Sequence, residues 1–332
     1  MVKLENFLNK RYSLRNISDE EFEKIVPILA EQLEKYDYTI IHSDNVLKKD
    51  WNNLLKWKSE TNELNSVSRI GMKICDHFFP NFYNIENNLG KSFSNCWTKT
   101  NLEKCLRWNR KSHSTPYLSE IKRGIYFCCG LTKSTMYRPQ LSKLLCMKYS
   151  PTNVFDPCAG WGGRMLGAVA SGANYIAFEP NTETFYNLQK IINFLNIEKQ
   201  VKIICDDAMN MDYYDFPNYD MIITSPPYFD VEIYSKEKTQ SITKLNDYDS
   251  WKDYFLKGII EKSITRLNED GVSCWNVGKV GKKDMRKDVI EIHKQFDYSY
   301  QTSFAITSSK RQALQNKEKN QKSKDLTDIF KK

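Results

Sequence analysis

Short apolar runs alternate with helical patterns along the second half of the chain. The runs have the length and the β-branched and aromatic content of buried strands, and the segments between them have the apolar spacing of amphipathic helices. The expected strands are Asn153–Phe155, Tyr175–Phe178, Val201–Cys205, Met221–Thr224, Val272–Val277, Phe304–Thr307 and a last, short Ile329–Phe330. The expected helices cover 183–195, 250–268 and 284–295. Strands that alternate with helices predict an α/β fold with a mostly parallel, seven-stranded sheet and helices on both of its faces.

The first 134 residues have a different pattern, with little glycine and few alternating runs. Ser18-Asp19-Glu20-Glu21 is typical of a capped helix start, and apolar residues with helical spacing follow it. Further helices are expected around 45–60, 64–79 and 117–129. We therefore expect two domains, a mainly helical one over 1–134 and an α/β one over 135–332.

Composition narrows the class of protein. Of the 332 residues, 40% are apolar and 27% charged, as in a soluble globular protein. No apolar run reaches the length of a membrane span, and the polar N-terminus lacks the core of a signal peptide, so a cytosolic or nucleus-like compartment is expected. The nine cysteines are expected to be reduced and mostly buried, and no Cys/His spacing predicts a metal site. The net charge of +8 would suit a polyanionic partner.

A glycine-rich turn follows the first strand of the α/β region, in FDPCAGWGGRMLGA, residues 155–168. Gly160 and Gly162 allow a tight turn and a close approach of the backbone to a ligand. Dinucleotide enzymes use similar turns, but Asp156-Pro157 stands directly before the glycines here. A carboxylate at that point would repel a pyrophosphate and would suit a ligand with an ammonium group. The turn therefore favours S-adenosylmethionine over NAD.

Acidic residues also follow the next two strands. Glu179 comes directly after the second strand and is placed to accept hydrogen bonds from ribose hydroxyls. Asp207 follows the third strand and is expected to accept from an adenine amino group, a role that its neighbour Asp206 could take instead. Open α/β sheets bind ligands at the carboxyl ends of their strands, so three acids there predict a nucleotide pocket.

A rigid corner, Ser225-Pro226-Pro227-Tyr228, ends the fourth strand. Double prolines can simply terminate a strand, but they also fix the backbone and leave its carbonyls free. The amino nitrogen of cytosine or adenine is a poor nucleophile because its lone pair is conjugated with the ring. The Ser225 side chain and the Pro226 carbonyl could hold the two amine hydrogens and bias the nitrogen towards sp3 geometry, while Tyr228 stacks on a flipped base.

Together, DPCAGWGG and TSPPY resemble the amino-group DNA methyltransferases, which modify N6 of adenine or N4 of cytosine. The resemblance covers roughly residues 135–280 and implies a Rossmann-like S-adenosylmethionine-dependent methyltransferase fold. MYRPQLSKLLCMKYSPT resembles a further motif of the family. The residues that the resemblance implies at the cofactor site are Asp156, Pro157, Ala159, Gly160, Gly162, Glu179, Asp206, Asp207, Arg138 and Pro139, and those implied in catalysis are Ser225, Pro226, Pro227 and Tyr228.

The motifs say less about which base is methylated and which region of the chain recognises the target. Serine at the start of the corner is commoner in N4-cytosine enzymes and slightly favours cytosine. Target reading is expected in the N-terminal region, where WTKTNLEKCLRWNRKSH mixes aromatic and basic residues. A helix with buried tryptophans and solvated lysines explains this stretch equally well. A basic segment at 308–325 is either a solvated loop or a contact to phosphates. The expected nucleic-acid contacts are Trp97, Lys104, Arg107, Trp108, Arg110, Lys111, Lys310, Arg311 and Lys317.

Other functions stay open at this point. Similar Pro-Pro-Tyr corners serve RNA bases and protein glutamine amides, so RNA or protein could be methylated instead of DNA. A catalytically silent subunit that binds the cofactor is a third reading, and a cognate restriction nuclease is the partner that the resemblance suggests. Pro157-Cys158 is similar to the nucleophile motif of C5-cytosine enzymes, but it lies in the cofactor turn, so a C5 mechanism is not expected.

Overall fold

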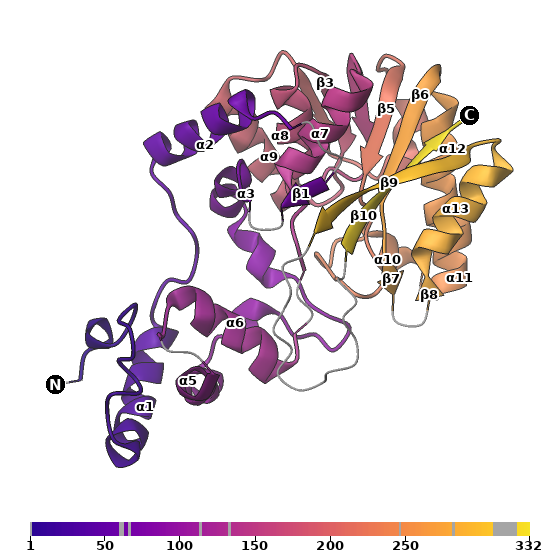
Figure 1. Cartoon of the computed structure of the whole chain (residues 1–332). Helices are drawn as coiled ribbons and strands as arrows, with labels where there is room; N and C mark the ends of the chain where they lie inside the picture. Colours follow the sequence, from indigo (N-terminus) through magenta and orange to yellow (C-terminus); the bar gives the residue numbers. More distant parts are fainter. Residues whose placement is uncertain are drawn as a thin grey trace. The chain divides into compact units, whose positions relative to one another are not determined.

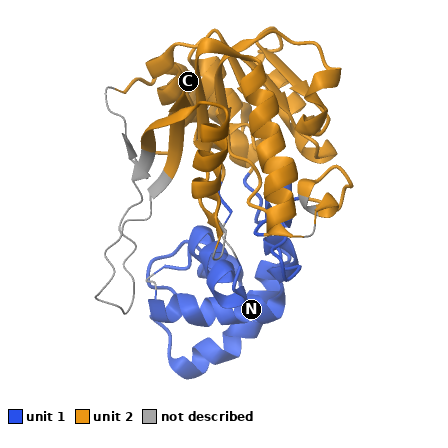
Figure 2. Ribbon diagram, turned by 90° about the vertical axis from the view of Figure 1, so that its right-hand side faces the viewer, with its two compact units in different colours: residues 1–40, 80–135, 231–234 blue, residues 41–79, 136–230, 235–332 orange. Residues whose placement is uncertain are grey.

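The computed structural model describes residues 2–332 except 60–62, 66–67, 113–114, 132–133, 246, 281–282 and 308–323. The chain divides into two compact units (Figure 2). Unit 1 comprises residues 1–40, 80–135 and 231–234, and unit 2 comprises 41–79, 136–230 and 235–332. One predicted boundary, near 135, coincides with an observed one. The division differs from the prediction elsewhere, because residues 41–79 belong with the sheet and 231–234 belong with the helical unit.

Unit 2 is built on one mixed sheet, with the strand order β1-β9-β10-β6-β5-β2-β3-β4 (Figure 1). Its strands are β1 (Glu63–Asn65), β2 (Asn153–Asp156), β3 (Asn174–Phe178), β4 (Val201–Ile204), β5 (Tyr219–Thr224), β6 (Leu267–Asn276), β9 (Ser299–Thr307) and β10 (Lys324–Lys331). Among the described strands of this sheet, β10 alone runs antiparallel to both of its neighbours. The predicted Rossmann-like α/β class is confirmed, and each of the seven expected strands is present. The short β1 is an eighth strand, and it corrects the helix expected around 64–79, of which α3 forms the part Met72–Phe78.

The helices of unit 2 connect these strands. They are α2 (Asp44–Lys56), α3 (Met72–Phe78), α7 (Pro139–Tyr149), α8 (Gly163–Ala170), α9 (Thr182–Leu195), α10 (Ser241–Lys244), α11 (Tyr248–Trp251), α12 (Lys257–Thr265) and α13 (Met285–Gln295). A π-helical turn, Lys252–Leu256, joins α11 to α12, and a short antiparallel pair is formed by β7 (Lys279–Val280) and β8 (Lys283–Asp284). Contacts join α8 to β3, α9 to β4, α12 to β6 and α13 to β9.

Two glycines let α7 lie directly against α8. A side chain on Gly163 would place its Cβ 1.9 Å from the carbonyl oxygen of Tyr137, and one on Gly167 would place it 2.2 Å from that of Pro139. Contacts this short are not tolerated, so no larger residue fits at either position without moving α7. The start of α7 is therefore fixed beside the start of α8.

Unit 1 is a helical body, as the sequence predicts. Its helices are α1 (Asp19–Glu34), α4 (Phe93–Cys96), α5 (Lys99–Ser112) and α6 (Leu118–Cys129), with single 3-10 turns at Leu4–Asn6 and Pro80–Asn84. The expected cap of α1 is present, because the Ser18 hydroxyl accepts a hydrogen bond from the Glu21 amide at 3.1 Å. Val26, Leu29 and Leu33 of α1 are fully buried in the core of this unit.

A segment from far along the chain completes unit 1. Glu86 and Ile233 form an antiparallel bridge with two hydrogen bonds, Glu86 N to Ile233 O at 3.0 Å and Ile233 N to Glu86 O at 2.8 Å. Only Phe229 and Asp230 separate Tyr228 from this segment. The chain that leaves the Pro-Pro corner therefore becomes part of the helical unit almost at once.

Three further expectations concern the cysteine thiols, a metal site and a membrane-spanning helix. None of the nine cysteines is paired in the structure, and six of them are buried, as the sequence predicts for most of them. Among the described residues, no His, Cys, Asp and Glu side chains gather as a metal site would require. None of the described helices has the length and the apolar content to span a membrane.

Candidate functional site

Four parallel strands bring the predicted residues to one edge of the sheet. The order β5-β2-β3-β4 places the carboxyl ends of these strands side by side. Ser225 follows β5, Glu179 follows β3 and Asp206-Asp207 lies shortly after β4, while Asp156 is the last residue of β2. The fold therefore assembles the glycine turn, the acids and the corner at a common edge, as the sequence predicts.

Asp156 is fully buried, and its carboxylate is saturated by groups of the protein itself. Oδ1 accepts from the Thr224 hydroxyl at 2.7 Å and from the Cys158 amide at 3.0 Å. Oδ2 accepts from Nε of Arg164 at 2.5 Å and from the Tyr175 hydroxyl at 2.6 Å. This corrects the expectation that the carboxylate meets an ammonium group of the ligand. Its charge is already neutralised by Arg164, so Asp156 shapes the site and does not face it.

The Arg164 guanidinium also organises the glycine turn. It donates to the carbonyl oxygens of Cys158 and Ala159, and it is itself buried. Gly160 and Gly162 have φ values of 58° and 74°, in the left-handed region that glycine tolerates best. The Ala159 amide donates to the Phe178 carbonyl at 2.8 Å, which ties the turn to the end of β3. Pro157 is buried under this turn.

Glu179 is buried at the end of β3 and touches the turn directly. Oε2 accepts from the Gly160 amide and Oε1 from the Asn181 amide, both at 2.9 Å. Burial raises the pKa of the Glu179 carboxyl to about 7, although the two backbone amides oppose that rise. Each oxygen has a second lone pair, so the carboxylate can still accept hydrogen bonds from a diol.

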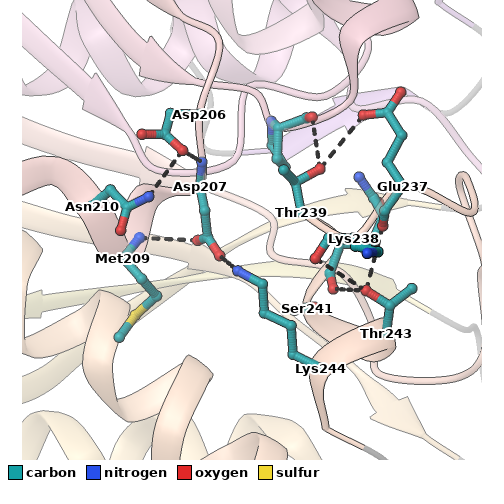
Figure 3. A network of polar contacts seen from close by, with 12 residues as sticks. Asp206, Asp207, Met209, Asn210, Glu237, Lys238, Thr239, Ser241, Thr243 and Lys244 are labelled. Carbon is teal, nitrogen blue, oxygen red and sulfur yellow. Dashed lines mark hydrogen bonds and ion pairs between the residues drawn. The ribbon is translucent and has the colours of Figure 1, made fainter.

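The two aspartates after β4, Asp206 and Asp207, have different hydrogen-bond partners (Figure 3). Asp206 is used locally: it accepts from the Asp207 amide, from Nδ2 of Asn210 and from the Tyr214 hydroxyl. Asp207 is buried and caps the turn that begins at Ala208, accepting from the Met209 amide at 3.0 Å. Its second oxygen, Oδ2, accepts from Nζ of Lys244 at 2.6 Å. Of the two, Asp207 keeps more capacity for a ligand.

Lys244 belongs to a segment, 235–244, that we call the strap. The strap reaches the chain beyond β3 as well. The Glu237 carboxylate accepts from the Thr182 amide at 3.3 Å, and the Thr239 hydroxyl donates to the Pro180 carbonyl at 3.0 Å. It thus contacts Asp207 itself and the residues that follow Glu179. Sequence reasoning missed these contacts, since nothing in KEKTQSITK marks the partners of its charged residues.

The Pro-Pro corner is held on both sides. Thr224, directly before it, donates to Asp156. The Tyr228 hydroxyl lies 3.2 Å from Oδ1 of Asn276 and 3.4 Å from the Asn276 carbonyl oxygen at the end of β6. Ser225 is half-buried, and its side chain makes no hydrogen bond within the described part of the chain. The hydroxyl of Ser225 is therefore available to a substrate.

Phe229 anchors the chain after the corner. Its φ of 49° is unusual for a bulky residue, and its ring is buried against Tyr248 and Trp251 with centroids 5.6 and 5.8 Å away. The aromatic packing offsets the strain of the left-handed backbone. It also fixes where Pro226, which is buried, and the half-buried Pro227 stand.

Arg138 and Pro139 begin α7, beside the start of α8. Pro139 occupies the first helical turn and is buried, while the Arg138 guanidinium donates to the carbonyl oxygen of Ser68. The start of α7 thus lies next to the glycine turn, because the Tyr137 carbonyl lies against Gly163. Burial and the nearby Asp156 carboxylate raise the pKa of the Cys158 thiol well above its usual range, so Cys158 is not a ready nucleophile.

The predicted nucleic-acid contacts on α5 and just before it need correction. Trp97 is buried in the core of unit 1 and donates from Nε1 to the Leu33 carbonyl, so it cannot stack on a base. Arg107 pairs with Glu23 and Glu103, and Arg110 pairs with Asp19. These arginines have carboxylate partners within unit 1. Lys104 and Lys111 are exposed and Trp108 is half-buried. Lys310, Arg311 and Lys317 lie outside the described residues.

Three residues that surround Asp156 are not among the site residues predicted from the sequence. Arg164, Tyr175 and Thr224 surround Asp156, and all three are buried. Arg164 follows the glycine pair and Thr224 precedes the corner, so their positions beside the two motifs were a usable signal. Tyr175 lies inside an apolar strand pattern and could not be told from core.

Comparisons with known proteins give a fold-level likeness at most. No family model matches the chain, and no curated protein matches it. Solved structures that resemble it include an rRNA methylase from Streptococcus thermophilus, with 15% identity over 60% of this chain and 99% of that one at a TM-score of 0.37. Others are a precorrin-6y C5,15-methyltransferase from Geobacter metallireducens, with 14% identity over 60% and 90% at 0.38, and a SAM-dependent O-methyltransferase from Thermotoga maritima, with 12% identity over 61% and 69% at 0.39. At these scores the likeness supports no conclusion about substrate or chemistry.

Proposed function

We propose that this protein transfers a methyl group from S-adenosylmethionine to the exocyclic amino group of a DNA base. The observation that carries the proposal is the direct link between the two motifs. Asp156, at the start of the glycine turn, accepts a hydrogen bond from Thr224, at the start of the Pro-Pro corner. A cofactor turn and a corner with free acceptors are thereby held next to each other at one sheet edge.

The residues at that edge fit S-adenosylmethionine. Glu179 offers two carboxylate oxygens for ribose hydroxyls, and Asp207 offers an acceptor for the adenine amino group. Gly160 and Gly162 leave space for a ligand against the turn. When bound, S-adenosylmethionine supplies a methyl group on a positively charged sulfur. A pyrophosphate would fit this edge poorly, because Glu179 and Asp207 both carry carboxylates there.

The corner provides what an amino nitrogen needs. The Ser225 hydroxyl and the Pro226 carbonyl are acceptors for the two amine hydrogens, and the prolines keep them in place. Holding both hydrogens draws the nitrogen lone pair out of conjugation, so that it can attack the methyl carbon. S-adenosylmethionine bound here would supply the methyl group to that nitrogen and leave as neutral S-adenosylhomocysteine, and the surplus proton of the methylated amine would pass to solvent. Tyr228, held at its hydroxyl by Asn276, offers its ring to the flipped base.

Cytosine N4 is the target that we favour slightly over adenine N6, because the corner begins with serine. Methylation of an RNA base or of a glutamine amide by the same corner remains an alternative, as does a silent subunit that only binds the cofactor. A silent subunit would have no need to keep both the glycine turn at 156–163 and the corner at 225–228 complete. The net charge of +8 is more compatible with a nucleic acid than with a protein substrate.

The test uses methyl-labelled S-adenosylmethionine and separate pools of duplex DNA, single-stranded DNA and RNA. The products are digested to nucleosides and identified by mass spectrometry. Labelled N4-methylcytosine or N6-methyladenine from DNA is the expected result. Label only in RNA would move the substrate to RNA. Measurable binding of S-adenosylhomocysteine with no label in any pool would refute a nucleic-acid methyltransferase.

A further inference from the structure

One stripe of α5 combines a tryptophan with two lysines. Lys104, Trp108 and Lys111 stand four and three residues apart, so they share one face of the helix. Lys104 and Lys111 are exposed, and neither has a carboxylate partner within the described part of the chain. Two helical turns separate them, which is about 10 Å along the helix axis. The opposite face of α5 is buried through Leu102, Cys105 and Leu106.

A second stripe, on α6, meets the first. Phe127 stacks on Trp108 with ring centroids 5.5 Å apart and an interplanar angle of 27°. The Arg123 guanidinium, one helical turn earlier, lies 5.6 Å from the centre of the Phe127 ring. Gly124 permits this arrangement, because a side chain there would place its Cβ 3.2 Å from Cε3 of Trp108. The indole therefore rests against the backbone of α6.

This face, made of Lys104, Trp108, Lys111, Arg123 and Phe127, does not have the character of a solvated helix surface. Phe127 is 58% exposed, an unusual position for a phenylalanine beside three cations. Arg123 has a carboxylate neighbour, Glu120, whose oxygen lies 3.5 Å away, so the basic character rests mainly on the two lysines. Aromatic rings at the centre with cations around them match a ligand that offers both flat apolar faces and phosphates.

We propose that this face binds an unpaired strand of nucleic acid. The inference rests on the proposed function and adds that the nucleic acid is bound single-stranded. In a duplex the faces of the bases are covered by their neighbours, so Trp108 and Phe127 would have nothing to stack on. In an unpaired strand a base stacks on Phe127 while Lys104, Lys111 and Arg123 contact the flanking phosphates. DNA and RNA share this chemistry, and the arms of the test separate them.

The test measures binding of the full chain to fluorescein-labelled 20-nucleotide single-stranded DNA, single-stranded RNA and duplex DNA by anisotropy. We expect Phe127→Ala to weaken binding of single strands about tenfold and binding of the duplex less than twofold. Tyr186→Ala is the matched control, because Tyr186 on α9 is 59% exposed and lies outside this face. Thermal unfolding of each variant checks that the fold is kept.

The lysines give an independent readout. In Lys104→Ala with Lys111→Ala, the slope of log affinity against log salt for single strands should fall by about 1.4, which corresponds to two lost phosphate contacts. Lys24→Ala, on α1 and paired with Glu20, should leave the slope unchanged. Unchanged single-strand affinity in Phe127→Ala, or an equal loss for duplex DNA, would overturn the inference.

The outcomes separate this inference from the proposed function. If the wild type methylates a base and Phe127→Ala binds single strands normally, the face is wrongly assigned and the function stands. If Phe127→Ala loses single-strand binding while the wild type transfers no methyl group to any pool, the face stands and the function fails.

Discussion

The Thr224 hydroxyl donates to Oδ1 of Asp156 across 2.7 Å, and this bond joins the last residue of β5 to the last residue of β2. Both residues are fully buried. The glycine turn and the Pro-Pro corner, which are about 70 residues apart in sequence, thus share one buried carboxylate. A change at Asp156 should therefore affect both motifs at once.

Asp156→Asn should destabilise the protein by about 3–5 kcal/mol, because it leaves the buried Arg164 guanidinium without its counter-charge. Urea unfolding followed by circular dichroism measures the change. Glu20→Gln breaks an exposed pair with Lys24 and should cost less than about 0.5 kcal/mol. Equal effects of the two substitutions would show that the Asp156–Arg164 pair is not structural.

Cofactor affinity should rise with pH through neutrality. The pKa of Glu179 is raised to about 7 by burial, so the carboxylate that would accept from ribose hydroxyls is mostly protonated at pH 6 and mostly ionised at pH 8. S-adenosylhomocysteine should bind about tenfold more tightly at pH 8 than at pH 6 in isothermal titration calorimetry. Glu179→Gln should bind weakly and without this pH dependence. A wild-type affinity that stays flat between pH 6 and 8 would contradict the assignment of Glu179.

The same carboxyl has the opposite effect on folding stability. Its pKa in the folded state lies above the usual 4.5, so the folded state holds the proton more tightly than the unfolded state does. Its contribution to stability is present below pH 4.5 and is lost as the pH rises through about 7. Urea unfolding without cofactor should show that Glu179→Gln removes this decline.

Lys244→Met should loosen the strap. The substitution removes the ion pair with Asp207, one of the contacts that hold residues 235–244 at the sheet edge. Because Lys244 is partly exposed, the pair contributes no more than about 1 kcal/mol, so amide hydrogen exchange in the strap should accelerate up to about fivefold. Mass spectrometry of peptides from 235–244 measures the rate. Lys262→Met, which removes the pair with Asp212, should leave the strap unchanged.

Ser225→Ala should lower kcat about 100- to 1000-fold, because it removes the hydroxyl that would accept a hydrogen bond from the substrate amine. Affinity for S-adenosylhomocysteine should stay within twofold of the wild type. Ser235→Ala, in the strap, changes the same residue type away from the corner. If Ser225→Ala turns over as fast as the wild type, the catalytic assignment of the corner is wrong.

The sheet could be predicted from sequence because its strands are buried and read as short apolar runs between helices. The edge strand β1 could not, since three residues, Glu63, Leu64 and Asn65, carry no strand pattern. The start of each site motif was also readable, from glycines and prolines that only a turn or a corner explains. The hydrogen-bond partner of each polar side chain could not be predicted from the sequence. Asp156 faces Arg164 and Tyr175 instead of a ligand, and Trp97 faces the Leu33 carbonyl instead of a base, because sequence spacing does not say which buried donor reaches which acceptor.

The Glu86–Ile233 bridge has a consequence for how the chain can be divided and made. Unit 1 needs residues from three stretches of the chain, the last of them at 231–234, and unit 2 needs 41–79 as well as everything after 135 apart from that stretch. Neither unit corresponds to a contiguous fragment that could be expressed alone. During synthesis, the helical unit lacks its last segment, residues 231–234, until the ribosome has passed the Pro-Pro corner. The two units therefore alternate along the chain, and unit 1 is complete once residues 231–234 are made, whereas unit 2 also needs the residues from 235 onwards.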